Sequence, residues 1–86
     1  MKALERVLKA LANRRRLAIL GYLKAHGEAA VGDIAHEIKL SFKATSKHLA
    51  ILYACNILEK DQRSSQMFYH LTVSQKPSVK HTLSLL

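Results

Sequence analysis

The sequence predicts a mainly α-helical domain with one small β-hairpin, in the order four helices, hairpin and a last helix. Three observations support this fold class. Apolar residues recur at intervals of three and four through most of the chain, which is the helical period. Two short runs of apolar, aromatic or β-branched residues flank the polar segment 62–65, as in a hairpin. The length of 86 residues indicates a single domain, 1–86, and 49% hydrophobic residues suffice for one core.

The first two helices follow from apolar spacing and capping residues. Four residues of the first helix have the i, i+3, i+4, i+7 pattern: Leu4, Val7, Leu8 and Leu11. Residues 2–12 therefore form an amphipathic helix. Asn13 is a good N-cap for a second helix, which Gly27 ends. Because the second helix is apolar around most of its circumference, we expect it at the centre of the domain.

Residues 31–55 have the pattern of a helix-turn-helix. The third helix is short, since its apolar residues leave room for two or three turns. A break near Leu40 follows, and Ser41 is a good N-cap for a longer fourth helix. A short helix, a tight break and a longer helix define this motif.

A wing and a C-terminal helix complete the fold. Residues 57–61 and 66–72 form the hairpin, so the wing spans 57–72. A hairpin directly after a helix-turn-helix makes the winged variety. In the last helix, residues 77–86, the apolar residues recur at i, i+4, i+7.

The chain is strongly basic. It has 14 Lys and Arg residues against 6 acidic ones, a formal net charge of +8. This charge favours a polyanionic partner such as nucleic acid or an anionic membrane, although a solvated basic surface is an alternative interpretation. No run of about 18 apolar residues and no secretory pattern occurs, so we expect a soluble, cytoplasmic protein without a membrane partner. The single cysteine, Cys55, excludes an internal disulfide.

The fourth helix has one face that suits DNA. Its inward positions are Thr45, Leu49 and Leu52. The outward arc then consists of Phe42, Lys43, Ser46, Lys47 and Ala50. A helix in the major groove needs an outer face without acids, with short hydroxyls near phosphates and lysines that reach phosphates or guanine edges. No acidic residue occurs from 39 to 58. The alternative is an ordinary amphipathic helix with solvated lysines.

Nine residues are candidates for contact with double-stranded DNA. They are Ser41, Phe42, Lys43, Thr45, Ser46, Lys47, His48, Arg63 and Ser64. His48 either donates to a phosphate or packs within the helix. Arg63 and Ser64 lie at the hairpin tip, where polar side chains follow a phosphate backbone, enter a minor groove or are simply solvated.

Three segments carry a family resemblance. Residues 11–20, LANRRRLAIL, look like the pattern Leu-Ala-Asp-Pro-Thr-Arg-Leu-x-Ile-Leu. Residues 40–52, LSFKATSKHLAIL, look like Leu-Ser-Gln-x-Thr-Val-Ser-x-His-Leu-x-x-Leu, and residues 67–71, MFYHL, like Val-Tyr-Tyr-x-Leu. These three patterns are those of the ArsR-type winged-helix transcriptional regulators, which the chain resembles over roughly residues 3–72.

The resemblance implies a homodimer that binds an imperfect DNA palindrome, usually as a repressor. It also implies that the first and last helices form the dimer contact. Seven apolar residues of those helices are the expected dimer interface: Leu4, Val7, Leu8, Leu11, Val79, Leu83 and Leu86.

The chain departs from the family at Phe42, where a polar base-reading residue is common, at Lys39, where a turn glycine is frequent, and at the glycine-free wing tip. Base preference therefore does not carry over.

The family's cysteine metal site is missing. Its motif Glu-Leu-Cys-Val-Cys-Asp-Leu matches residues 28–34, where Ala30 and Gly32 replace both cysteines. A second metal site of the family uses acidic residues and histidines on the last helix, and of these ligands only His81 is present here. We therefore expect no metal and no cofactor, and the effector is unknown. Cys55 is either a small buried hydrophobic residue or a redox switch.

Enzyme chemistry finds no support, since the chain has neither a glycine-rich phosphate loop nor paired carboxylates. The fold alone does not fix the ligand, so an alternative function is a basic winged-helix module that binds RNA or a protein partner.

Overall fold

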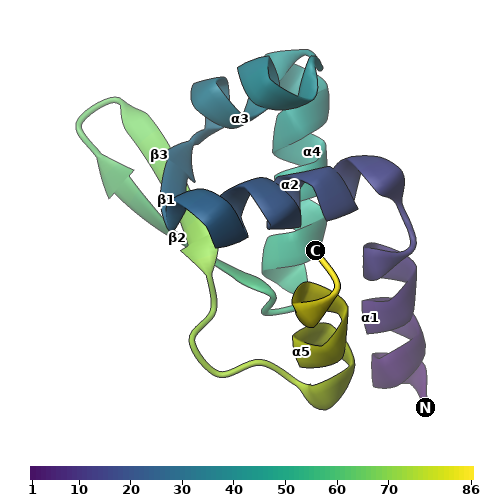
Figure 1. Ribbon diagram of the computed structural model, residues 1–86. Helices are drawn as coiled ribbons and strands as arrows, with labels where there is room; N and C mark the ends of the chain where they lie inside the picture. The colour runs from purple at the N-terminus through teal and green to yellow at the C-terminus, as the bar shows by residue number, and fades with distance from the viewer.

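The computed structural model describes residues 1–86 and contains five helices and a three-stranded antiparallel sheet (Figure 1). In chain order the elements are α1 (Lys2–Leu11), α2 (Arg14–His26), β1 (Glu28–Ala30), α3 (Val31–Ile38), α4 (Phe42–Ala54), β2 (Leu58–Arg63), β3 (Gln66–Leu71) and α5 (Pro77–Ser84). The predicted winged helix-turn-helix is confirmed. Helix ends agree with the expected ones to about one or two residues, the usual uncertainty of helix boundaries.

The predicted helix caps are confirmed. The Asn13 side chain accepts hydrogen bonds from the backbone N–H groups of Arg15 and Arg16, at 3.0 and 3.1 Å. Gly27 ends α2 with a φ of 87°, in the region that favours glycine. Ser41 Oγ accepts a hydrogen bond from the backbone N–H of Ala44 at 3.1 Å. These caps fix where two helices begin. They are α2, the central helix, and α4, the second helix of the helix-turn-helix, which is called the recognition helix in this motif.

The sheet contains a strand that the sequence analysis did not predict. The strand order is β1-β3-β2, and Glu28, Ala29 and Ala30 of β1 pair with residues 70, 69 and 68 of β3. With three residues, two of them alanine, β1 has no strand pattern of its own. It is a strand because β3 supplies its hydrogen-bonding partner.

The hairpin turn is shorter than expected. Gln62 and Arg63 belong to β2, so the turn consists of Ser64 and Ser65 rather than of residues 62–65. Ser64 has a φ of 56°, in the left-handed region. The Gln62 side chain donates a hydrogen bond to the Ser64 carbonyl at 3.1 Å, which helps to hold this turn without glycine.

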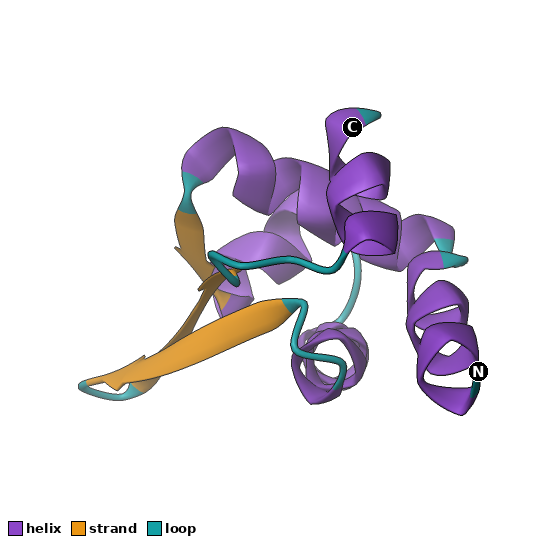
Figure 2. Ribbon diagram, turned by 90° about the horizontal axis from the view of Figure 1, so that it is seen from below, coloured by secondary structure: helices purple, strands orange, loops and turns teal.

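The core surrounds α2, as predicted. Ile19, Leu20 and Leu23 of this helix are almost completely buried. The residues packed around them include Val7 and Leu11 of α1, Ile34 of α3, Leu49 and Leu52 of α4, Ile57, Leu58 and Tyr69 at the sheet, and Val79 of α5. The β2–β3 hairpin extends away from this helical body (Figure 2). None of the helices combines the length and apolarity that a membrane crossing requires.

Candidate nucleic-acid interface

The turn between α3 and α4 positions the recognition helix. Lys39 ends α3 in the left-handed conformation, with a φ of 56°. The backbone N–H of Leu40 then donates to the Ala35 carbonyl at 3.0 Å, which closes the end of α3. Ser41 follows in extended conformation and caps α4. The break is therefore three residues long and sets the two helices at a fixed angle.

The faces of α4 are those that the sequence predicts. Thr45, Leu49 and Leu52 are fully buried. Phe42, Lys43, Lys47 and Ala50 are exposed, and Ser46 is half-buried between the two groups. The two lysines lie one turn apart on the outer arc, and neither forms a salt bridge within the chain. Both ammonium groups are thus available to a polyanion.

Thr45 takes no part in this outer surface. Thr45 is 0% exposed, and its Oγ1 is buried without a hydrogen-bond partner. The side chain therefore faces the core, although its place in the motif made it a candidate for DNA contact.

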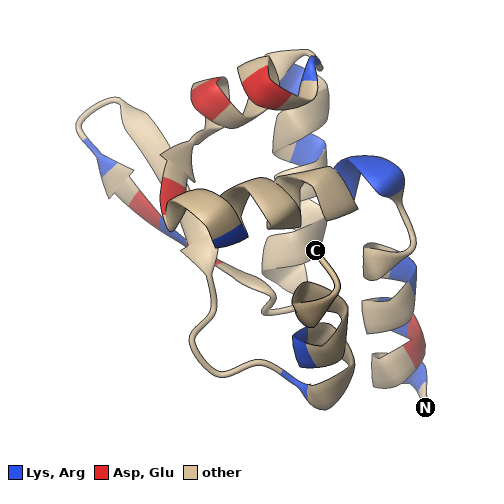
Figure 3. Cartoon of the chain, in the orientation of Figure 1, with Lys and Arg blue, Asp and Glu red and all other residues tan.

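A second cluster of cations lies at the start of α2. Arg14, Arg15 and Arg16 form the first turn, and Figure 3 shows their basic segment next to the last turn of α1. Arg16 reaches α4, where its Nη1 lies 3.1 Å from Nδ1 of His48. The desolvation of His48, with the nearby charges of Arg16 and Arg15, lowers the pKa of its imidazole. His48 is half-buried and connects the basic start of α2 to the recognition helix.

The wing arginine is not free. Arg63 forms a bidentate ion pair with Glu28, with both N···O distances at 2.7 Å. Its Nη2 also lies 3.5 Å from Oδ2 of Asp61. Its guanidinium also stacks over the Phe68 ring, 4.6 Å from the centroid. Hydrogen bonding from Arg63 lowers the pKa of the Glu28 carboxyl. Any phosphate contact by Arg63 competes with this pair, whereas Ser64 at the turn has no such partner.

The role of Glu28 was not visible in the sequence. Its partner Arg63 is 35 residues away, and the two meet only because β1 pairs with β3. A prediction of the third strand would have been needed to bring them together.

The expected dimer residues fall into two groups. Val7, Leu11 and Val79 are 3%, 5% and 1% exposed, so they are covered within the protomer, and Leu83 packs against the same core. Val79, which we expected at the dimer interface, is therefore covered by its own protomer. By contrast, Leu4, Leu8 and Leu86 are 44%, 48% and 43% exposed.

Two grooves flank the exposed leucines of α1. One, of about 310 Å³, is lined by Leu4, Leu8 and Ala12 with neighbouring residues, and its walls are almost entirely apolar. The other, of about 550 Å³, lies between the start of α1 and residues 76–78 at the start of α5. The apolar side chains between these grooves form an unpartnered surface, which we call the α1 surface and define by Leu4, Leu8 and the two grooves.

Metal-ligating side chains do not gather anywhere. The chain has no group of three or more His, Cys, Asp or Glu residues placed to hold a metal ion. Cys55 is buried at the end of α4, with its thiol 4.0 Å from the Arg6 carbonyl oxygen. His26 stacks on Tyr22, and His70 pairs with Glu59 across the β2–β3 ladder at 3.0 Å.

The comparisons with known proteins agree with this architecture. Residues 13–60 match the family model described as bacterial regulatory protein, arsR family. The transcriptional activator HlyU of Vibrio cholerae is 36% identical over 80 residues, which cover 93% of this chain and 70% of that protein. The arsenical resistance operon repressor of Bacillus subtilis is 30% identical over 71 residues, or 83% of this chain and 68% of the relative.

Solved structures give the same result at the level of the fold. Reduced HlyU from Vibrio cholerae superposes with a TM-score of 0.82 at 34% identity, over 99% of this chain and 85% of that one. A homodimeric winged helix-turn-helix DNA-binding domain from Mycobacterium bovis gives a TM-score of 0.81 at 32% identity, over 98% and 74% of the two chains. The chain therefore belongs to the arsR family of bacterial regulatory proteins and is a winged helix-turn-helix, DNA-binding transcription regulator, not an enzyme.

Proposed function

We propose that the chain acts in the bacterial cytoplasm as a homodimer that binds an imperfect palindrome in double-stranded DNA, with α4 in the major groove. The observation that carries this proposal is the outer arc of α4, where Lys43 and Lys47 are exposed, unpaired and not opposed by any acid of the same helix. Lysines in this arrangement reach phosphate oxygens and guanine edges.

The DNA-contacting residues that we propose lie on α4, at its N-cap and at the wing. They are Ser41, Phe42, Lys43, Ser46, Lys47, His48, Arg63 and Ser64. Thr45 is left out because it is buried. Arg63 belongs to the set only when a phosphate displaces Glu28 from its guanidinium.

The dimer contact that we propose is the α1 surface, together with the exposed Leu86 that follows α5. Leu4 and Leu8 expose apolar area that no element of the protomer covers, and the grooves beside them suit the leucines of a two-fold related copy. The related domain from Mycobacterium bovis is described as homodimeric. A two-fold axis here would place the two copies of α4 in successive major grooves, about 34–36 Å apart.

We also propose that the protein is a repressor and works without the family's cysteine metal site. A dimer on a promoter excludes polymerase without needing a further contact, which makes repression the simpler outcome. Among the relatives, HlyU is named an activator and the Bacillus subtilis protein a repressor. Transcription in vitro from a bound promoter distinguishes the two, since addition of a repressor lowers transcript yield.

Two measurements test DNA binding itself. Selection of genomic fragments by the purified protein should recover a shared, imperfectly palindromic sequence. An anisotropy titration should then show tighter binding to that duplex than to random duplex, and weaker binding to random single-stranded RNA. Preference for the single-stranded RNA, or no recovered sequence, would favour a basic winged-helix module with another ligand.

A further inference from the structure

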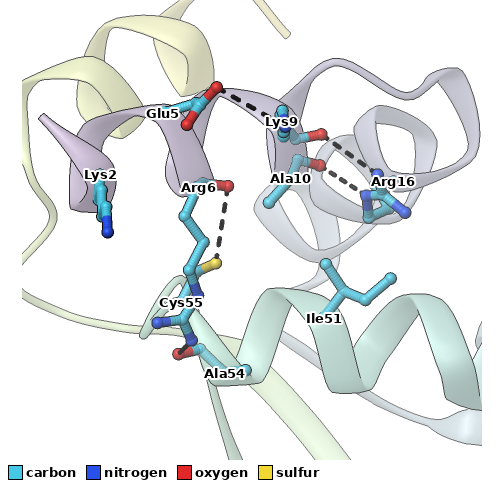
Figure 4. A pocket seen from close by; sticks show the side chains of 9 residues that line it. All are labelled: Lys2, Glu5, Arg6, Lys9, Ala10, Arg16, Ile51, Ala54 and Cys55. Atoms are coloured by element: carbon cyan, nitrogen blue, oxygen red, sulfur yellow. Dashed lines mark hydrogen bonds and ion pairs between the residues drawn. The ribbon is translucent and has the colours of Figure 1, made fainter.

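One arginine connects three helices at the edge of the recognition surface. Arg16 Nε donates to the Ala10 carbonyl at 2.6 Å, and its Nη2 donates to the Lys9 carbonyl at 3.2 Å. Figure 4 shows both contacts, beside the hollow between α1 and α4. The remaining Nη1 lies 3.1 Å from Nδ1 of His48 on α4. A single guanidinium thus joins the end of α1, the start of α2 and the recognition helix.

This arrangement explains why a cation is tolerated in the first turn of α2. The positive end of a helix dipole disfavours arginine there. The Arg16 guanidinium, however, lies against the last carbonyl groups of α1, at the negative end of that helix, where a cation is favoured. Arg14, in the same turn, is exposed and makes no side-chain hydrogen bond in the chain. The two residues therefore differ in their contacts although they are nearly adjacent.

The contact also determines which nitrogen of His48 carries the proton. A guanidinium has only hydrogen-bond donors, so Nδ1 of His48 must accept, and a neutral imidazole then carries its proton on Nε2. Nε2 has no hydrogen-bond partner within the chain and is not among the buried unpartnered atoms, so it is open to solvent.

The surroundings of His48 favour the neutral ring. The charged groups that act on it are the guanidinium groups of Arg16 and Arg15 at the start of α2. Burial, followed by the charges of Arg16 and Arg15, lowers the pKa of His48. A folded-state pKa below the unfolded one means that the neutral ring's contribution to stability is present above the unfolded pKa and is lost as the pH falls below it.

We propose that Arg16 is a positioning residue for DNA binding, because it holds His48 in the Nε2–H form and aims that N–H at a DNA phosphate beside the recognition helix. The inference rests on the proposed function and adds a neutral donor to the lysines of α4. A neutral donor releases no counterion, so this contact adds affinity without steepening the salt dependence.

The first test needs no DNA. Long-range ¹H–¹⁵N spectra of histidine-labelled protein report the tautomer and the titration of each imidazole. In the wild type we expect His48 to show an acceptor-type Nδ1 and a protonated Nε2 at neutral pH, with a titration midpoint below that of a free imidazole. Arg16→Gln should mix the two tautomers and raise the midpoint. Arg14→Gln removes the same charge from the same turn and should change neither.

The second test measures duplex affinity at several salt concentrations. His48→Ala should weaken binding by about tenfold, the loss expected for one hydrogen bond to a charged group, with an unchanged salt slope. Arg16→Gln should weaken binding by at least a similar factor. The double variant should be no weaker than Arg16→Gln, since both changes remove the same contact. Arg14→Gln should retain wild-type affinity or lose it only through a reduced salt slope.

Each outcome decides the proposal. A wild-type His48 with its proton on Nδ1 overturns it, and so does a His48→Ala variant that binds the selected duplex as well as the wild type. These two measurements do not depend on whether Arg16→Gln folds. If the wild type binds no duplex at all, the proposed function fails as well; if it binds and only the His48 results disagree, the inference alone fails.

Discussion

Thr45 is a threonine at a buried position of α4, where the family's recognition-helix pattern has valine. Its Oγ1 is removed from water and has no partner, which costs free energy that a methyl group of the same size would not. We expect Thr45→Val to raise the free energy of unfolding by about 1 kcal/mol and the melting temperature by roughly 4–8 °C. Duplex affinity should stay unchanged, because the residue does not reach the surface. Thermal unfolding of both proteins, with a matched binding titration, checks this; a lower melting temperature would mean that Oγ1 has a partner after all.

Phe42 is 62% exposed in the first turn of α4, where a polar base-reading residue is common in the family. An aromatic side chain there suits contact with the 5-methyl group of thymine. Replacement of thymine by deoxyuridine in the selected duplex should therefore weaken wild-type binding, by about fourfold for one buried methyl group. Phe42→Ala should abolish this sensitivity, whereas Lys43→Ala should retain it. Equal sensitivity of Phe42→Ala and the wild type would show that Phe42 contacts no thymine methyl.

The wing is the element in which neighbouring charges alter the expected role of a residue. The sequence makes Arg63 a candidate for phosphate contact, but Glu28 of β1 holds its guanidinium at 2.7 Å. Glu28→Gln should free Arg63, so affinity should rise on all duplexes and the salt slope should steepen by up to about 0.9. Glu37→Gln, which removes an exposed acid of α3 that has no ion pair, is the control for net charge. If both variants behave alike, Arg63 makes no phosphate contact.

The pH dependence of this ion pair has a definite sign. Arg63 lowers the pKa of Glu28, so the pair persists at neutral pH and is lost only as the pH falls through that lowered value. The pairing therefore remains intact under ordinary binding conditions, and only a substitution or a competing phosphate separates the two residues.

Elements defined by local signals were predictable from the sequence. The caps Asn13 and Ser41 and the apolar spacing of the helices depend on residues within one turn, and each was found where expected. The strand β1 was not, because it exists only through its pairing with β3. The ion pair of Glu28 with Arg63 and the contact of Arg16 with His48 were not predictable either, because each joins residues more than thirty positions apart in the sequence.

The α1 surface should hold two protomers together in solution. Leu8→Glu places a charge in this apolar contact, so we expect a 9.7 kDa monomer by light scattering where the wild type has twice that mass. Helicity should be unchanged, because Leu8 is half exposed in the protomer. Val73→Glu, at a 95% exposed loop position, should remain dimeric. A wild type that is monomeric at micromolar concentration would exclude the two-fold arrangement.

The outer face of α4 is the surface that we propose to bind double-stranded DNA, and Lys43 and Lys47 are its two exposed lysines. Lys43 lies in the first turn, whose side chains usually reach base edges, and Lys47 lies one turn later on the same face. The two lysines should therefore differ in the kind of binding energy that they contribute.

The decisive measurement is a salt series of affinities on the selected duplex and on random duplex, for the wild type, Lys43→Ala, Lys47→Ala and Ser46→Ala. Lys43→Ala should cost about 1–3 kcal/mol on the selected duplex and much less on random DNA. Lys47→Ala should weaken both duplexes about equally and reduce the salt slope by roughly 0.9, and Ser46→Ala should have a smaller effect. If no variant changes either affinity by more than about twofold, which is within ordinary context effects of a solvated residue, α4 is not the surface that binds DNA.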